Sequence, residues 1–378
     1  MALSQTARIR AVFFLHAISS GGLYSRLPSI QRDLGLDFGT LGLVLSGLTA
    51  GSILTFFFVS RLIEGFGPRR VLTATIPFMG LGTALIAAMP SGPALFAYLI
   101  FYGVLYSLPN AAMNIEADRV EAAAGRRVMN SCHGLWSIGY LLATLLGTLA
   151  VALQLPPLWH FGLLAIPLLG IGLWVTLGID PAPARAHAAT QVRRFALPTL
   201  AIVLLVAFAI GPNLLEGGLR NWSVIYMRDS FGAPGWVDTL TLPVFLIAQA
   251  AGRLRADGWV TRFGPVRTAR VLTAIAATGC VLVVFAPHLI VALLGFLLIG
   301  VGVCTTYPLT TSAATRLGDR PASQNVAALT LVNQLVQLGA PPLLGAIANH
   351  AGIRAVFTVA LPFVVASVWL ARSLNRHR

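Results

Sequence analysis

One short element occurs twice in this chain, and the two copies lie 197 to 200 positions apart. Phe66-Gly67-Pro68, followed by Arg-Val-Leu-Thr-Ala at 70–74, returns as Phe263-Gly264-Pro265, followed by the same five residues at 270–274. Weaker matches fall in order at nearly the same offset: Gly21-Gly22-Leu23 with Gly217-Gly218-Leu219, Pro109 with Pro308, and Leu145-Leu146-Gly147 with Leu343-Leu344-Gly345. The pattern predicts two copies of one structural unit.

The chain is too apolar for a soluble domain. Of its 378 residues, 57% are hydrophobic and 10% are charged, whereas soluble domains are about 25% charged. Runs of about 20 apolar residues span a bilayer, and lipid leaves a bare backbone amide without a partner, which favours helices. We expect twelve membrane-spanning helices, at approximately 9–30, 39–60, 71–90, 93–115, 128–152, 158–178, 198–227, 237–254, 269–287, 289–313, 324–348 and 353–373. They form an N-terminal six-helix bundle at 1–178 and a C-terminal one at 198–378, joined by a cytoplasmic linker at 179–197. Two parallel copies of this kind imply a binding site between them.

The net charge of +14 follows from the placement of arginine. All 26 residues of the Lys and Arg class are arginine. If the N-terminus is cytoplasmic, the arginines gather in the loops on the cytoplasmic side. The exceptions are Arg26, Arg32, Arg220, Arg228 and Arg354. This distribution obeys the positive-inside rule and places both termini in the cytoplasm. It also accounts for the charge without nucleic-acid binding, which needs a clustered soluble patch.

The two copies of the repeated element resemble the loop between helices 2 and 3 of the major facilitator superfamily. That loop has a glycine, an acidic residue, and then a glycine with basic residues. Glu64 stands at the acidic position of the first copy, although Ser60 and Gly65 depart from the pattern, and the second copy keeps Gly252 and Asp257. The resemblance implies an all-α membrane protein of twelve helices in two parallel halves. It also implies a cytoplasmic gate of charge pairs and helix-end dipoles, with the alternative of a merely solvated basic loop. The candidate gate residues are Glu64, Arg69, Arg70, Asp257 and Arg262.

A narrower resemblance covers the expected fourth and fifth helices. Asn110-Ala111-Ala112-Met113-Asn114, Glu121 and the run from Gly125 to Gly139, which includes Asn130-Ser131-Cys132-His133 and Trp136, are similar to a poorly characterised subgroup of bacterial inner-membrane permeases. This subgroup is distantly similar to the fucose–proton symporters. The resemblance implies transport of a small-molecule substrate across the bacterial inner membrane, by a multi-pass protein that we expect to be a monomer. It names no substrate.

Two charges fall within the expected seventh helix. Glu216 and Arg220 are four residues apart, so they can pair on one helix face. The repeat aligns Glu216 with Ser20, about 16 Å along the first expected helix, which predicts a position near the bilayer midplane. An ionisable group there costs about 2.5–3.5 kcal/mol and is a functional candidate. Gly211-Pro212 and Gly217-Gly218 predict a weakened or discontinuous helix around it. Either Glu216 alternates between a protonated and an arginine-paired state, with Arg220 as its partner, or the two form a static ion pair.

Other polar residues are candidates for proton coupling or solute binding. His133 shares a helix face with Asn130 and Trp136 and can change its charge near physiological pH, although a packing histidine is an equal alternative. For His16 we favour a packing role. Amide, hydroxyl and aromatic side chains in the helices can bind a polar solute, or they can hold helices together. The substrate-binding candidates are Ser20, Tyr24, Asn110, Asn114, Trp136, Asn213, Trp222, Gln249, Tyr307, Asn333 and Gln337. Trp222 and Tyr226 fit an interfacial aromatic belt equally well.

The sequence carries no signature of an enzyme or of an ATP-driven pump. No GxxxxGK[ST], HExxH or Gly-x-Ser-x-Gly element is present. Cys132, Cys280 and Cys304 are too far apart for a metal site, so we expect neither metal nor cofactor nor catalytic residues. We expect a secondary transporter that moves a small polar organic solute by alternating access, driven by protons or, alternatively, by sodium. Drug efflux is a second alternative, although helix 5 reads Gly139-Tyr140 where proton-driven drug antiporters carry Gly-Pro. A non-transporting sensor on the same scaffold is the alternative from another class.

Overall fold

The computed structural model describes residues 3–125, 127–180 and 197–375, and the chain divides into two units, Met1–Thr190 and Gln191–Arg378. The division falls within the expected linker 179–197, of which 181–196 lie outside the described residues. Throughout the described ranges the secondary structure is helical, with turns and no strand. This confirms the predicted all-α fold.

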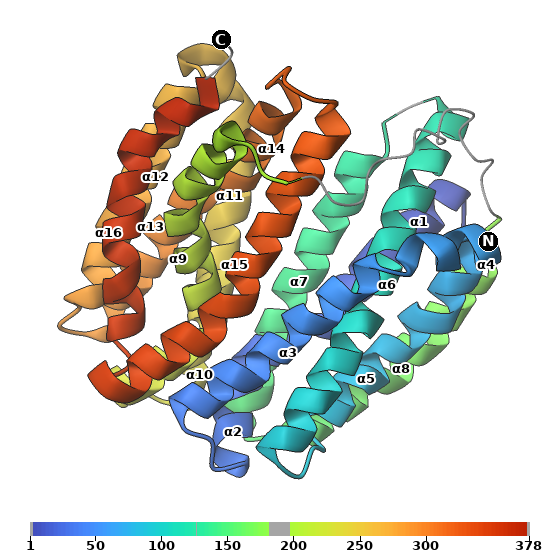
Figure 1. Cartoon of the computed structure of the whole chain (residues 1–378). Coiled ribbons are helices and arrows are strands. Elements are labelled where there is room, and N and C mark those ends of the chain that lie inside the picture. The colour runs from blue at the N-terminus through green and yellow to red at the C-terminus, as the bar shows by residue number, and fades with distance from the viewer. Residues whose placement is uncertain (1–2, 126, 181–196, 376–378) are drawn as a thin grey trace. The chain divides into compact units, whose positions relative to one another are not determined.

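Unit 1 contains six spans, coloured blue to green in Figure 1. They are formed in order by α1 (Gln5–Ser20) with α2 (Leu23–Asp33); α3 (Phe38–Phe56) with the part of α4 (Val59–Thr75) before Gly67; the part of α4 after Gly67 with η1 (Ile76–Phe78) and α5 (Met79–Ile86); α6 (Gly92–Ala124); α7 (Met129–Ala152); and α8 (Pro157–Leu177). α1 packs against α6, α7 and α8, and α3 packs along α6. The α3–α6 crossing is close because both helices present glycine. A Cβ on Gly51 would lie 1.9 Å from the Ile100 carbonyl oxygen.

Unit 2 contains the other six spans. They are formed by α9 (Leu200–Phe231), α10 (Gly235–Thr239) with α11 (Thr241–Phe263), α12 (Pro265–Val284), α13 (Leu289–Val303) with α14 (Thr306–Thr315), α15 (Ala322–Ala351), and α16 (Ala355–Leu370) with η2 (Ala371–Asn375). α12 packs along α13, and α16 packs against α9 and α12. Tyr226 is fully buried among these helices, where its ring meets Phe296 and Phe357 edge-on and its hydroxyl donates to the Val283 carbonyl at 2.6 Å. It is therefore a core residue of unit 2 and not part of an interfacial belt.

Nine helices of the described ranges are each long and apolar enough to cross a membrane alone. The other three of the twelve expected spans have physical reasons to differ. The first and third are interrupted along their length. The eighth, α11, carries Arg253, Arg255 and Asp257 toward its end. The mean hydropathy of α11 is lower because the helix continues beyond its apolar segment into these charged residues.

The duplicated Phe-Gly-Pro element forms the same turn in both units. Gly67 has φ 77° and ψ 154°, and Gly264 has φ 78° and ψ 161°. This left-handed region favours glycine, and in each case the following proline, Pro68 or Pro265, starts the next helix, where its missing N–H is not needed. The helices before the turn reach Phe66 and Phe263. The expected spans left 61–70 and 255–268 between them, whereas in the structure helix continues to Phe66 and Phe263 and one glycine makes each turn.

The glycine pairs behave differently in the two copies. The first span is interrupted at Gly21-Gly22, between α1 and α2, although one unbroken helix was expected at 9–30. α9 runs without interruption through Gly217-Gly218, so the discontinuity expected there is absent. Close helix packing explains why residue 211 is glycine. A Cβ on Gly211 would lie 2.5 Å from the backbone of Val364, so the glycine allows α16 to pack closely against α9 and does not make a hinge.

Candidate functional site

The charged pair of unit 2 lies at the middle of α9. Glu216 is 16 residues past Leu200 in a helix of 32 residues, which places it about 24 Å along the axis. A guanidinium nitrogen of Arg220 lies 2.8 Å from Glu216 Oε1, and the two side chains are 32% and 26% exposed. The predicted pairing on one helix face is thus present. The Glu216 carboxylate is partly exposed at the centre of a membrane-length helix.

An amide bridge continues this polar face one turn earlier. Asn213 Nδ2 donates to Asn333 Oδ1 at 3.2 Å, which joins α9 to α15. Asn213 is three residues before Glu216, so both lie on the same side of α9. Gln337 follows Asn333 by one turn of α15 and is exposed. The structure therefore brings together Asn213 and Asn333 beside the charged pair in unit 2.

In unit 1 a histidine joins three helices. His16 of α1 is fully buried, and its Nε2 lies 3.0 Å from the Tyr106 carbonyl oxygen of α6. The indole N–H of Trp136, on α7, donates to His16 Nδ1 at 3.2 Å. An indole nitrogen only donates, so Nδ1 accepts and the ring proton lies on Nε2, where it is donated to Tyr106. These contacts define His16 as neutral and fix its tautomer.

The anchored Trp136 presents an aromatic surface. Its ring stacks on Tyr140, one turn later on α7, with centroids 5.2 Å apart and planes 17° apart. Tyr140 is buried, whereas Trp136 is partly exposed. Asn110 and Asn114, also partly exposed, follow Tyr106 at four-residue spacing on α6, and Asn114 Nδ2 donates to Asn110 Oδ1 at 3.0 Å. Unit 1 thus has a polar and aromatic face on α6 and α7, positioned by a histidine of α1.

His133, the histidine favoured from the sequence, has a different setting. It is exposed, and its ring meets the edge of Phe13 at 5.2 Å. Trp136 bonds to His16 instead, because its indole N–H is directed at α1. The proton-coupling role of His133 stays a prediction, and His16 is the histidine that contacts Trp136. The sequence feature that could have indicated this contact was a single histidine, His16, within the apolar run of α1.

The remaining substrate-binding candidates are scattered. Ser20 is buried, and its hydroxyl donates to the His16 carbonyl at 3.0 Å. Trp222 and Gln249 are also buried, at 0% and 4% exposure. Tyr24 is partly exposed and Tyr307 is 65% exposed. The buried positions of Ser20, Trp222 and Gln249 argue against direct solute contact in this conformation.

Of the candidate gate residues, Arg69 has the most definite contact. It donates to the Leu177 carbonyl at 2.6 Å, and Arg8 donates to the Trp174 and Val175 carbonyls at 2.9 and 3.1 Å. Both cations therefore cover the C-terminus of α8, where unpaired carbonyls and the helix dipole favour positive charge.

The other gate candidates form no ion pair with any residue that the structure describes. Arg262 lies 5.2 Å from the ring centre of Phe263. Glu64, Arg70 and Asp257 are exposed, and none of them has an ion pair within the described ranges.

Glu121 of α6 has a structural role that the sequence did not indicate, whereas Glu116 of the same helix is fully buried. Glu121 Oε2 accepts hydrogen bonds from the backbone N–H groups of Val128 and Met129, at 2.7 and 2.9 Å. This carboxylate satisfies amides at the start of α7 that have no partner within the helix. It therefore sets where the helix carrying Trp136 begins.

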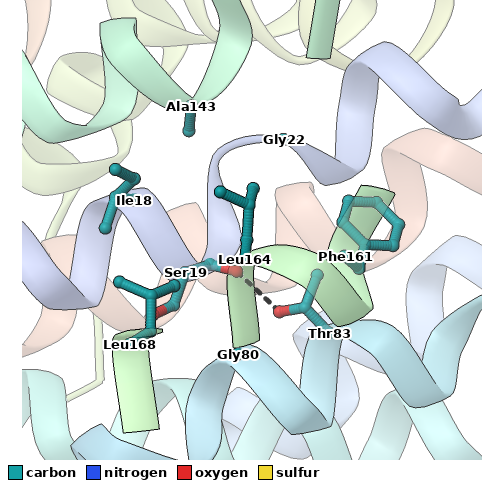
Figure 2. A pocket seen from close by; sticks show the side chains of 9 residues that line it. All are labelled: Ile18, Ser19, Gly22, Gly80, Thr83, Ala143, Phe161, Leu164 and Leu168. Atoms are coloured by element: carbon teal, nitrogen blue, oxygen red, sulfur yellow. Dashed lines mark hydrogen bonds between the residues drawn. The ribbon is translucent and has the colours of Figure 1, made fainter. Parts of the chain in front are cut away.

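A small internal cavity lies beside the interruption of the first span, and Figure 2 shows its lining. Thr83 donates to the Ser19 carbonyl at 2.7 Å across it. Gly22, Phe161 and Leu164 also line it. The cavity has room for about one water molecule, which is too little for an organic solute.

Comparison of the sequence with protein families shows which family the chain belongs to. The model of the Major Facilitator Superfamily matches residues 11–341. The chain belongs to the major facilitator superfamily. Membership makes this multi-pass membrane protein a transporter and not an enzyme.

Individual members of the superfamily resemble the chain over nearly its full length. It is 30% identical to the uncharacterised transporter y4wD of Sinorhizobium fredii (strain NBRC 101917 / NGR234) over 370 residues, covering 97% of each chain. Among solved structures, the nucleoside transporter NupG has a TM-score of 0.74 at 16% identity, covering 98% of both chains. A D-xylose–proton symporter also has a TM-score of 0.74 at 16% identity, covering 98% of this chain and 96% of the other. At such identity these structures show the shared fold.

Proposed function

We propose that this superfamily member is a proton-coupled secondary transporter that moves a small polar organic solute by alternating access. One observation carries the proposal: the partly exposed Glu216–Arg220 pair at the middle of α9. Charges deep in a membrane protein are expensive and mark ion or substrate pathways. A pair of this kind offers a carboxylate that can exchange a proton for its arginine partner.

The coupling step follows from the chemistry of this pair. When Glu216 is ionised, Arg220 compensates its charge at 2.8 Å. When Glu216 is protonated, Arg220 is released and can bind an electronegative group of the solute. Proton binding and solute binding then become linked. Protonation of Glu216 removes the negative partner of Arg220, and the bound solute supplies another. A static pair makes no such link.

The solute class is inferred from the polar faces of the two units. Trp136 stacked on Tyr140 offers a flat surface for a sugar or base ring, and Asn110, Asn213 and Asn333 offer amides. The fold is shared with proteins whose names state nucleoside transport and D-xylose–proton symport. We therefore favour uptake of a hydroxyl-rich solute with a ring. The bacterial origin of y4wD supports residence in a bacterial inner membrane. The arginine distribution supports cytoplasmic termini, and we propose that the chain is a monomer.

The test uses purified protein in proteoliposomes, with radiolabelled uridine and D-xylose as probes. An imposed pH gradient is expected to drive accumulation of at least one probe. Glu216→Gln is expected to abolish gradient-driven accumulation while retaining exchange of labelled for unlabelled probe. Asp229→Asn is the matched control, because Asp229 pairs with Arg228 at the end of the same helix. Full gradient-driven accumulation by Glu216→Gln would refute coupling, and a wild type that moves neither probe would reject this solute class.

A further inference from the structure

A buried guanidinium in α2 has no ion-pair partner among the described residues, although the exposed Asp33 of the same helix acts on it from a longer distance. Arg26 is 2% exposed, and one of its terminal nitrogens donates to the Leu155 carbonyl, just before α8. Its Nε has no hydrogen-bond partner in the part of the chain that the structure describes. Among the described residues no carboxylate lies within ion-pair distance of Arg26. A buried charge without a partner is strongly unfavourable, so an anion that reaches it is strongly favoured.

A second buried polar side chain lies at the same place. His160, in the first turn of α8, is 4% exposed, and neither of its ring nitrogens has a hydrogen-bond partner among the described residues. Its ring borders α2, since a Cβ on Gly22 would lie 3.4 Å from His160 Cε1. Arg26 follows Gly22 by one helical turn on the same face of α2. Arg26 and His160 therefore meet where α2 crosses the start of α8.

Three features at this crossing favour negative charge. The guanidinium supplies a full positive charge with an unused N–H, an imidazole supplies at least one more N–H donor, and the N-terminus of α8 contributes amides and the positive end of its dipole. Water would satisfy the donors and leave the charge uncompensated. A cation would add to the charge.

We propose that Arg26, His160 and the start of α8 form a binding site for one small inorganic anion, of which chloride is the representative. Both side chains are nearly fully buried, which excludes an organic anion from the site. Neither Arg26 nor His160 lines the cavity of Figure 2, although Gly22, which borders the His160 ring, does. The site belongs to unit 1 and is independent of the Glu216 pair in unit 2 and of the function proposed for it.

The first test measures thermal unfolding of the full chain in detergent. The three cysteines are buried and free, so a thiol-reactive dye reports unfolding. Chloride replaces gluconate at constant ionic strength, and ligand binding to the folded state raises the midpoint saturably. We expect a rise of several degrees in wild type and in the control Arg32→Gln, which alters an exposed arginine of the same helix. Arg26→Gln is expected to lose the rise, and His160→Phe to need at least about fivefold more chloride. An unchanged wild-type midpoint, or a wild-type response in Arg26→Gln, would overturn the proposal.

A second measurement does not depend on the folding of Arg26→Gln. Chloride-35 NMR of the wild-type protein is expected to show excess line broadening that bromide relieves by competition and that His160→Phe reduces. Absence of excess broadening in wild type would overturn the site. Formate tests the occupant: stabilisation by formate but not by chloride would assign a carboxylate and reject an inorganic anion.

Discussion

Replacing His16 by phenylalanine tests whether this histidine positions the aromatic surface of unit 1. Phenylalanine keeps the approximate size of the ring and removes both nitrogens. The Tyr106 carbonyl then loses a donor, and the indole N–H of Trp136 loses its acceptor. We therefore expect a loss of stability together with a displaced Trp136.

The magnitude follows from the two hydrogen bonds. Each contributes about 1 kcal/mol net, and a buried group left without a partner costs about 1–3 kcal/mol. Trp136 is partly exposed, so its indole can turn toward water, which reduces the cost on that side. The Tyr106 carbonyl lies inside α6 and loses the donor that His16 supplies from α1. The expected loss in unfolding free energy is about 1–2 kcal/mol.

Denaturant unfolding in detergent measures the stability, and fluorine NMR of fluorotryptophan-labelled protein reports the position of Trp136. The Trp136 resonance, assigned with Trp136→Phe, is expected to shift in His16→Phe. The control is His133→Phe, which removes an exposed histidine from the neighbouring helix and is expected to cost less than about 0.5 kcal/mol. If the two variants lose equal stability and the Trp136 resonance stays in place, His16 is an ordinary packing residue.

Two further predictions concern backbone features. Gly67→Ala and Gly264→Ala force a side chain into the left-handed region and are each expected to cost about 1–2 kcal/mol, seen as a lower midpoint in the thiol-dye assay. Gly65→Ala is the control, since it adds a methyl to an open helical position, and an equal loss there would contradict the conformational reason. Glu121→Ala removes the acceptor at the start of α7 and is expected to cost about 1–2 kcal/mol, with partial recovery in Glu121→Gln. The same change at the exposed Glu64 is expected to be nearly neutral, and the capping role fails if the two alanine variants behave alike.

The twelve spans and their two-fold repetition were predictable because each depends on a local property. Apolar length defines a span, and arginine placement defines its direction. The turns were not predictable in the same way. Phe66-Gly67-Pro68 with its flanking charges has the composition of a loop, yet the helix continues to the glycine because its end extends beyond the apolar segment. The composition of a segment indicates whether its residues lie in lipid or in water, and it does not indicate their backbone angles.

The same distinction separates the parts of the candidate site. Glu216 and Arg220 were paired from the sequence because four-residue spacing on a helix fixes their contact. His16 and Trp136 are 120 residues apart, and their contact depends on how α1 packs against α7. A packing histidine and a site histidine have the same apolar neighbours in sequence. Only the tertiary contacts distinguish His16 from His133.

A single glycine, Gly67 or Gly264, makes the turn between consecutive spans in each unit, although in unit 1 the helix before it is also interrupted at 57–58. A change in the tilt of one helix is passed to the next as rotation about the two backbone bonds of one glycine. Sliding of one span past its neighbour is excluded at this end by the length of the chain. Each unit therefore has a one-glycine turn between two helices about which their tilt changes, and the duplication has placed these turns at corresponding positions of both units.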